Sequence, residues 1–299
     1  MKNKLSISES QGKSGNFFIN TDDNEFILKT ITDDELNLIT TSFIKKYAKY
    51  LSKNKDSLLC RLYGLFQITL IEKHVNVILM KNVAGKCKPN IICSYDLKGS
   101  TLNRQVTFDM ERVQKIVMKD NNFEEIEKFL YLDQYDRLKL QQITKNDSEF
   151  LNKLGLMDYS LLVLKLSIKE NEVLIEKLIK IENIKGLKEN VSSAINKYLY
   201  KSIHPGSAYI ISIIDYFQLY NFFKLMETNI KFYIGARPDK VTDISCVPPD
   251  VYSKRFVEYI ERITNFNIIE MSQKDEIYKS STVILDKSRE IELSRSDTV

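Results

Sequence analysis

Two apolar runs, each interrupted by a single aspartate, constrain the fold of this chain more than any other feature. The run YIISIIDYF, residues 209–217, places Asp215 directly after a strand-like segment, and LGLMDYSLLVLKL, residues 154–166, places Asp158 before another. An aspartate at a strand end can simply accept hydrogen bonds from its own turn. A functional role for either carboxylate requires partners elsewhere in the chain.

Composition restricts the class of protein. A chain of 299 residues with 43% hydrophobic and 28% charged residues is an ordinary globular mixture, long enough for one large domain or two lobes. The net charge of +4 suits contact with anionic lipid or phosphate, but it is too small to predict nucleic-acid binding. Only His74 and His204 are present, and no H-E-x-x-H zinc pattern occurs, so proton transfer or metal binding would fall mainly to carboxylates.

The cysteines and the hydropathy pattern indicate an intracellular setting. The four cysteines show no C-x-x-C spacing and no secretory signal opens the sequence, which favours a reducing compartment. No apolar run approaches the roughly 20 residues that span a bilayer. We therefore expect a cytoplasmic protein that is soluble or works peripherally at a membrane surface.

The first strands predict a hairpin beside a glycine-containing loop. Residues 17–19 and 25–31 read as strands joined by the turn-rich segment 20–24. Just before them, Gly12, Lys13, Ser14 and Gly15 could bring backbone N–H groups close to phosphate oxygens. A plain surface turn is the alternative interpretation.

A capped helix follows, and more strands come after it. Thr32 and Glu35 form a T-x-x-E capping box, and apolar residues then recur at helical spacing at positions 36, 39, 43, 47 and 51. Residues 62–71, 75–80 and 91–97 read as further strands, which predicts a mostly antiparallel sheet with one helix packed on it.

Lys29 lies inside the strand FILKTI. An exposed strand lysine is one interpretation. Its place after a glycine turn and before a helix bearing Glu35 matches the order in which a strand lysine contacts nucleotide phosphates and a helix glutamate orients it.

The second half adds helices and the two acids. Residues 124–132 and 148–154 carry apolar residues at helical spacing, and the strand 209–214 is expected to lead into a helix from Tyr216 to about Met226. Two acids next to apolar strands, together with Lys29, form the skeleton of an ATP phosphoryl-transfer site. One acid would accept the proton of the nucleophile and the other would hold Mg²⁺, which makes Asp215 the candidate metal ligand.

The motifs resemble those of a known family. The protein-kinase signatures H-R-D and D-F-G are missing, but GKSGNFF, FILKTI, LLCRLYGLF, YDLKGSTLNR, LGLMDYSLLV, SIIDYFQLYNF and ISCVPPDVYSKRF occur in this order. This series, from about Gly12 to Ile260, resembles the phosphatidylinositol phosphate kinases, most closely the phosphatidylinositol 4-phosphate 5-kinases. DLKGST and MDYSLL are the most specific of these motifs.

The resemblance implies an α+β fold with two lobes, distantly like a protein kinase. Residues 1–97 would form an amino-terminal lobe with an antiparallel sheet, residues 98–265 a mixed catalytic lobe, and residues 266–299 a polar tail. ATP and Mg²⁺ are the implied cofactors, and a phosphoinositide in an anionic membrane is the implied substrate.

The resemblance also implies roles for individual residues. Lys29 would contact the ATP phosphates beneath the loop Gly12–Gly15, Asp158 would be the catalytic-loop acid, and Asp215 would bind the metal. Lys98 of YDLKGST would lie near the transferred phosphate, where a mobile ammonium stabilises developing charge. Arg104 would hold a phosphate of ATP or substrate, or would be an ordinary surface arginine.

In the resembling family the segment after Asp215, here about 216–247, decides the substrate. Its basic and apolar residues suit a loop that dips into an anionic leaflet and grips phosphates, with Lys224 and Lys231 as candidate substrate contacts. Glu227 matches the acid that family members acting on the 5-hydroxyl of phosphatidylinositol 4-phosphate tend to carry. A surface loop with ordinary charges, and a solvent-facing Glu227, are the alternatives.

Departures from the family pattern leave a second function open. Only Lys224 stands where the family has two adjacent lysines, and residues 164–167 replace the usual Gly-Ile-His-Asp. The longer amino-terminal region that often builds the dimer interface in the family is missing, so a monomer or a different homodimer contact is expected. The alternatives to a 4-phosphate 5-kinase are a 5-phosphate 4-kinase and a pseudokinase scaffold that binds membranes without turnover.

Overall fold

The computed structural model describes residues 6–9, 17–70, 73–107, 113–114, 116–168, 198–220 and 246–266. The expected nucleotide loop Gly12–Gly15 lies outside the described residues. So do Lys224, Glu227 and Lys231 and, apart from Phe266, the expected tail.

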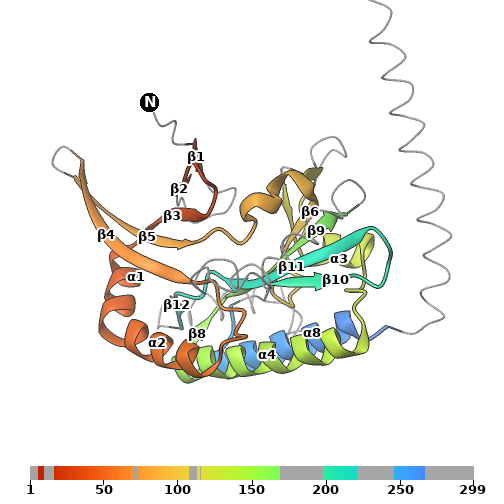
Figure 1. Ribbon diagram of the computed structural model, residues 1–299. Coiled ribbons are helices and arrows are strands. Elements are labelled where there is room, and N and C mark those ends of the chain that lie inside the picture. Colours follow the sequence, from red (N-terminus) through yellow and green to blue (C-terminus); the bar gives the residue numbers. More distant parts are fainter. Residues whose placement is uncertain are drawn as a thin grey trace, which may run out of the picture.

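The first sheet is antiparallel and has five strands in the order β1-β2-β3-β5-β4 (Figure 1). The strands are β1 (Ser6–Glu9), β2 (Phe17–Asn20), β3 (Phe26–Ile31), β4 (Leu62–Leu70) and β5 (Lys73–Lys81). The predicted β2–β3 hairpin is confirmed, with Phe18 opposite Lys29. β3 is also paired with β5, so Lys29 lies on an interior strand.

A continuous helical segment follows β3. It consists of α1 (Asp33–Leu38), the π-helical turn η1 (Ile39–Phe43) and α2 (Ile44–Lys53). The capping box is confirmed, because Glu35 N donates to Thr32 Oγ1 and Thr32 N donates to Glu35 Oε2. The predicted apolar stripe faces inward, with Phe43 and Tyr47 buried in the main core.

The second sheet has the order β10-β11-β9-β6-β7. It contains β6 (Ile91–Leu97), β7 (Val117–Met118), β9 (Ser160–Ser167), β10 (Leu199–Lys201) and β11 (Ser207–Ile214). All neighbours are antiparallel except β6 and β7, which run parallel.

The position of β6 corrects one expectation. The strand 91–97 was assigned to the amino-terminal sheet, but it pairs with β9 of the second sheet. β9 is buried along nearly its whole length, so the backbone N–H and C=O groups on both of its edges need hydrogen-bond partners, which β11 and β6 provide. A short 3₁₀ helix, η2 (Gly85–Asn90), carries the chain from β5 to β6.

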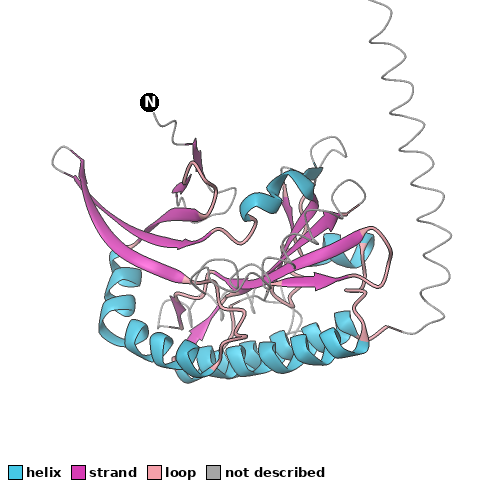
Figure 2. Ribbon diagram, in the orientation of Figure 1, coloured by secondary structure: helices cyan, strands magenta, loops and turns pink. Residues whose placement is uncertain are grey.

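Three helices and a two-stranded pairing complete the described fold. They are α3 (Asp120–Ile126), α4 (Gln134–Lys153) and α8 (Pro249–Thr264), with β8 (Leu156–Met157) paired to β12 (Gln218–Leu219). Figure 2 shows α4 and α8 side by side beneath the sheets, with α1 and α2 extending the same layer. The α+β class is confirmed, and no helix among the described residues has the length and apolar character of a membrane span.

The helix expectations in the second half need correction. The helix expected at 124–132 is earlier, at Asp120–Ile126, and the one expected at 148–154 is the end of the longer α4. The helix expected from Tyr216 does not begin there, because Tyr216 and Phe217 are drawn into the core and the chain then pairs with β8. The rest of that expected helix, from residue 221, lies outside the described residues.

A short segment before β4 attaches the first sheet to the second. Cys60 N donates to Ile213 O at 2.9 Å, and Ile213 N donates to Leu58 O at 2.8 Å. Leu59 also forms an isolated parallel bridge with Ile213. The entry to β4 is therefore fixed to the end of β11, next to Asp215.

Candidate active site

Three of the expected site residues lie at one edge of the second sheet. Leu97 at the end of β6 is opposite Leu161, and Ile214 at the end of β11 is opposite Ser160, so both strands end where β9 begins. Lys98 follows β6, Asp215 follows β11 and Asp158 precedes β9. We refer to these three residues as the acid edge.

Both aspartates have unusual backbone conformations. Asp158 has a φ of 63° and Asp215 a φ of 58°, in the left-handed region that residues with a side chain rarely adopt. Such a conformation is unfavourable by about 1–2 kcal/mol for most residues, although Asp and Asn tolerate it better. Outliers of this kind cluster at functional sites, where the surrounding structure maintains them.

Lys29 joins the acid edge from the first sheet. Its Nζ donates to Asp215 Oδ1 at 2.6 Å. The lysine side chain is 7% exposed, whereas that of Asp215 is 42% exposed. Burial disfavours the ammonium, but the Asp215 carboxylate outweighs it and the pKa of Lys29 is raised. Lys29 is therefore a fixed positive charge beside an accessible carboxylate.

Lys98 forms the second cation–carboxylate pair. Its Nζ lies 2.7 Å from Asp158 Oδ1, although that oxygen has no partner that meets hydrogen-bond geometry among the described residues. The side chains are 13% and 30% exposed. Among the described residues, Asp158 Oδ1 is thus held by the charge of Lys98 and not by a hydrogen bond.

Arg104 is buried, at 7% exposure, which removes the interpretation as a surface arginine. Its Nε donates to Asp120 Oδ2 at 2.6 Å and its Nη2 to Asp96 Oδ1 at 2.7 Å. Burial opposes the charged form, yet the two carboxylates raise the pKa of Arg104 further. These donors neutralise acids of the chain itself, a geometry that does not support the expected role in phosphate binding.

Glu35 also differs from expectation. It was expected to orient Lys29, but its carboxylate accepts from Thr32 N at 2.8 Å and serves the start of α1. The direct partner of Lys29 is Asp215, while the charge of Glu35 also helps to raise the pKa of Lys29.

Sequence reasoning missed three residues that surround the acid edge. Asp120 is buried and bonds the backbone of Lys98. Each acid is also followed by a fully buried tyrosine: Tyr159 OH lies 2.6 Å from Ser148 Oγ, and Tyr216 OH donates to Cys60 O at 2.5 Å. The repeated Asp-Tyr dipeptide was the only available signal for the tyrosines.

A hollow of about 380 Å³ lies beside the second sheet, at some distance from the acid edge. Its lining includes Asn82 from the β5–β6 connection, Ser94 on β6 and Leu164 on β9. Ser94 precedes Leu97 by three residues, which is about 10 Å along a strand. The hollow and the acid edge are therefore separated by about 10 Å of β6.

The donor set fits a magnesium ion that is shared with a ligand. Within the described ranges, no three His, Cys, Asp or Glu side chains form a cluster that could hold a metal alone. Mg²⁺ is commonly bound by one or two carboxylates with phosphate and water oxygens completing the shell. Asp215, with its partly exposed carboxylate, fits this mode.

The comparisons with known proteins support the family resemblance of the sequence motifs. The family model described as Phosphatidylinositol-4-phosphate 5-Kinase matches residues 1–263. A Plasmodium falciparum phosphatidylinositol 4-phosphate 5-kinase is 30% identical in an alignment 289 residues long that covers 87% of this chain. The human phosphatidylinositol 5-phosphate 4-kinase type-2 alpha is 27% identical in an alignment 293 residues long that covers 86% of this chain.

The extent of these matches differs. The chain spans 16% of the length of the Plasmodium relative and 69% of the human one. A probable phosphatidylinositol phosphate kinase of Dictyostelium discoideum is 31% identical over 163 residues, which are 54% of this chain and 22% of that protein. Because the family model covers nearly the whole described fold, the chain belongs to the phosphatidylinositol-4-phosphate 5-kinase family of phosphatidylinositol phosphate kinases.

Proposed function

We propose that this protein transfers the terminal phosphoryl group of ATP to a phosphatidylinositol phosphate. The observation that carries the proposal is the meeting of two cation–carboxylate pairs, Lys29 with Asp215 and Lys98 with Asp158. Their four members come from distant parts of the chain and meet at the ends of β6 and β11 and the start of β9. Phosphoryl transfer needs this combination of positive charge, a metal-binding acid and a proton acceptor.

Each residue has a distinct task. Magnesium-bound ATP supplies the phosphoryl group and part of the positive charge. Asp158 accepts the proton of the attacking inositol hydroxyl through the part of its side chain that is exposed, while its buried Oδ1 stays beside Lys98. Lys98 stabilises negative charge as the phosphoryl group moves, Asp215 binds the metal, and Lys29 orients Asp215 and contacts the phosphates.

The hollow near Asn82 is the proposed place of the adenine base. Its separation of about 10 Å from the acid edge along β6 is comparable to the reach from the base to the end of a triphosphate. The loop Gly12–Gly15 remains the proposed cover of the phosphates. Substituting Ser94, which lines the hollow, by Phe should raise the KM for ATP more than it lowers kcat.

We propose the 5-hydroxyl of phosphatidylinositol 4-phosphate as the acceptor. Support comes from Glu227 in its sequence context, with Lys224 and Lys231 as the phosphate contacts. Relatives named for 5-kinase and for 4-kinase activity both match this chain, so the choice rests on that loop. Glu227→Ala should shift preference toward the 5-phosphate isomer, while Glu258→Ala, which alters an exposed helix side chain, should not.

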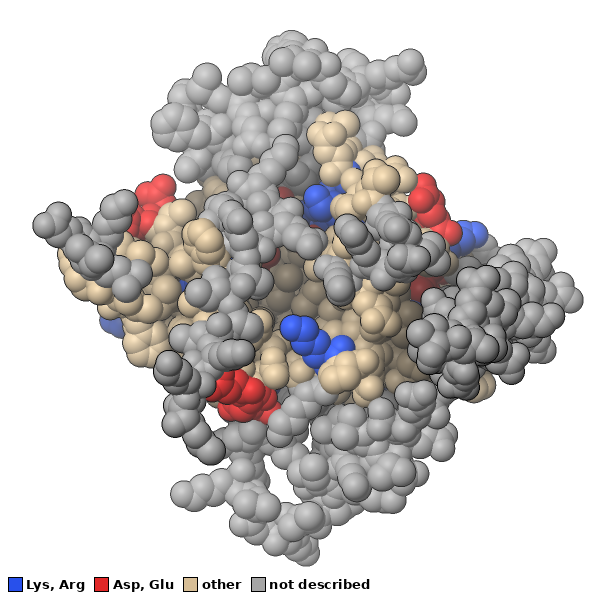
Figure 3. Space-filling model, turned by 90° about the horizontal axis from the view of Figure 1, so that it is seen from above, with Lys and Arg blue, Asp and Glu red and all other residues tan. Residues whose placement is uncertain are grey.

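The protein is proposed to act in the cytoplasm by reversible contact with anionic membranes. On the face seen in Figure 3, the basic and acidic side chains of the described residues are scattered and form no single basic patch. Attraction would then depend on the basic loop 216–247 and a net charge of only +4, so salt should weaken it. Co-sedimentation with vesicles that ignored both salt and anionic lipid content would contradict this.

The structure weakens one of the two arguments for a pseudokinase. That alternative rested partly on the altered residues 164–167. Lys165 is buried and its Nζ lies 2.8 Å and 2.9 Å from the two carboxylate oxygens of Glu127, so the change supports an internal ion pair. This departure from the family pattern at residues 164–167 does not affect the four residues of the two cation–carboxylate pairs.

The deciding experiment is a radiolabelled ATP assay on vesicles containing each of the three phosphatidylinositol monophosphates, with the position of the new phosphate determined. Product from the 4-phosphate lipid, labelled at the 5-position and lost in Asp158→Asn, supports the proposal. Membrane binding without any labelled lipid would favour the scaffold.

A further inference from the structure

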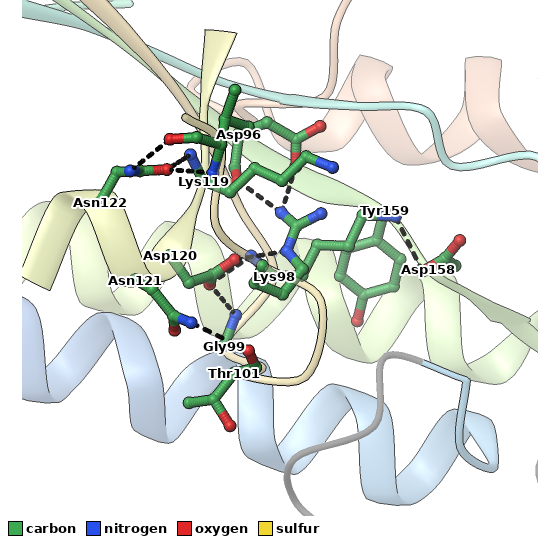
Figure 4. A network of polar contacts seen from close by, with 12 residues as sticks. Asp96, Lys98, Gly99, Thr101, Lys119, Asp120, Asn121, Asn122, Asp158 and Tyr159 are labelled. Atoms are coloured by element: carbon green, nitrogen blue, oxygen red, sulfur yellow. Dashed lines mark hydrogen bonds and ion pairs between the residues drawn. The ribbon is translucent and has the colours of Figure 1, made fainter. Parts of the chain in front are cut away.

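Asp120, the first residue of α3, lies at the centre of the network drawn in Figure 4. Its Oδ1 accepts from Lys98 N at 2.9 Å and from Gly99 N at 2.8 Å, and its Oδ2 accepts from Arg104 Nε at 2.6 Å. The residue is 1% exposed. One buried carboxylate therefore holds both backbone amides of the turn that carries Lys98.

Arg104 makes this burial tolerable. A carboxylate without a counter-charge would be strongly unfavourable in the interior, whereas a hydrogen-bonded guanidinium compensates it. Arg104 also donates to Asp96 Oδ1, and Asp96 lies on β6 just before the turn. The turn is thus tied to β6 through Asp96 and to α3 through Asp120.

The turn has little room to move. Gly99 has a φ of 68°, which favours glycine, and a Cβ placed there would lie 2.9 Å from Tyr259 Cβ on α8. The backbone is therefore pressed against α8 on one side and bonded to Asp120 on the other. Under these two constraints the Lys98 side chain extends to Asp158, 2.7 Å away.

The far end of α3 is also anchored. Glu127, just after the helix, forms the buried ion pair with Lys165 on β9. α3 is therefore fastened to the second sheet by a buried acid at each end. Of these two acids, only Asp120 contacts the turn that carries Lys98. Glu127 at the other end of the helix can therefore serve as a control for Asp120.

We propose that Asp120 is a positioning residue of the phosphoryl-transfer site: it fixes the turn 97–100 so that the Lys98 ammonium is held at Asp158. The proposal rests on the proposed function, because Lys98 is placed there at the moving phosphoryl group. It adds a residue that has no contact with the reacting atoms and acts only through Lys98.

The main test is a double-mutant cycle. Asp120→Asn keeps the shape of the side chain but removes the charge that holds Arg104. We expect kcat to fall by about 100-fold, with the KM for ATP changed less than about twofold, because misplacing a catalytic group by about 1 Å can have an effect of this size. In a Lys98→Met background the same substitution should lower kcat by less than about twofold.

Two further variants separate positioning from stability. Asp120→Glu keeps the charge and moves the carboxylate by one methylene, so it should also lower kcat. This variant tests the proposal if Asp120→Asn folds poorly. The control, Glu127→Gln with Lys165→Met, neutralises the other anchor of α3 and should reduce thermal stability while kcat stays within about threefold.

A measurement independent of turnover completes the test. Amide hydrogen exchange at Lys98 and Gly99 should be faster by at least about tenfold in Asp120→Asn, while exchange along β6 stays unchanged. The inference is overturned if exchange at the turn is unaffected, if Asp120→Asn lowers kcat equally in both backgrounds, or if the control lowers kcat as much.

The outcomes also distinguish this inference from the proposed function. If the unaltered protein labels no lipid, the proposed function fails, while the exchange experiment still reports whether Asp120 holds the turn. If the unaltered protein is active and Asp120→Asn and Asp120→Glu both keep full kcat, the inference alone fails.

Discussion

The ammonium of Lys29 and the carboxylate of Asp215 lie 2.6 Å apart, although 186 positions separate them in the sequence. Lys29 belongs to the first sheet, whereas Asp215 follows the last long strand of the second. The pair therefore joins the two sheets at the acid edge. The Asp215 side chain is 42% exposed and can be reached by a ligand, whereas the Lys29 side chain is only 7% exposed.

Replacing Lys29 by Met should lower kcat/KM by about 10²–10³-fold, the usual effect of removing one charge-stabilising donor. The free energy of unfolding should change little, because the exposed Asp215 carboxylate can hydrate once its partner is lost. Steady-state kinetics and thermal unfolding measure the two effects. Lys201→Met, at an exposed strand lysine, is the control and should change neither.

Replacing Asp215 by Asn should abolish magnesium-dependent turnover and leave the fold intact. Asn tolerates the left-handed backbone at this position, so the substitution removes the charge without adding strain. Asp215→Ala would remove the charge and also strain the backbone, so the free energy of unfolding of this variant should be lower by about 1–2 kcal/mol. Near-normal turnover of the Asn variant across a magnesium titration would show that Asp215 does not bind the metal.

Local sequence signals predicted the elements that depend on neighbouring residues. The hairpin 17–31 and the Thr32–Glu35 capping box were found because turn and cap chemistry act within a few residues. The two acids were found because an isolated carboxylate in an apolar run is conspicuous. These signals were enough to place Lys29, Asp158 and Asp215 at strands that the structure brings together.

Long-range pairing could not be predicted in the same way. The segment 91–97 looks like any strand, and its local sequence does not reveal that it pairs with β9 of the second sheet. Arg104 and Asp120 are 16 residues apart and meet through the parallel pairing of β6 with β7, so their bond had no local signal. A capping role for Glu35 and a Lys29-orienting role give the same sequence pattern; in the structure the carboxylate accepts from Thr32 N, and its charge also helps to raise the pKa of Lys29.

Replacing Arg104 by Met should destabilise the protein by about 3–5 kcal/mol, since it leaves Asp120 buried without its counter-charge. Urea unfolding measures this. The control is Arg262→Met, because Arg262 pairs with Glu124 at an exposed site and such pairs contribute at most about 1 kcal/mol. A stable Arg104 variant with a raised KM for ATP or lipid would instead support the expected phosphate contact.

Tyr216 should be important for stability through both its ring and its hydroxyl. Its ring stacks on Phe43 with centroids 5.6 Å apart, and its hydroxyl bonds Cys60 O. Tyr216→Phe should lower the free energy of unfolding by about 1 kcal/mol and Tyr216→Ala by about 3–5 kcal/mol. Equal losses in the two variants would show that the ring contributes nothing beyond the hydrogen bond.

The last prediction concerns Asp147, which lies inside α4 and links it to α2. Its Oδ1 accepts from Tyr50 OH at 2.7 Å and its Oδ2 from Leu58 N at 2.7 Å. Burial nevertheless dominates and raises the pKa of Asp147 above the ordinary value of 3.8. Between the ordinary and the raised pKa, the folded protein binds more protons at this site than the unfolded chain does. The contribution of Asp147 to stability therefore falls as pH rises through that interval and is constant above it.

Asp147→Asn removes this titration and keeps an oxygen that can accept from Leu58 N. The free energy of unfolding of the variant, relative to the unaltered protein, should thus increase as pH rises from the ordinary pKa of 3.8 through the raised pKa of Asp147. Urea unfolding at several pH values measures this difference directly. Glu149→Gln, at an exposed position on the same helix, is the control and should follow the unaltered protein. A difference between Asp147→Asn and the unaltered protein that stays constant or shrinks as pH rises would mean that the Tyr50 and Leu58 hydrogen bonds outweigh the burial of the charge.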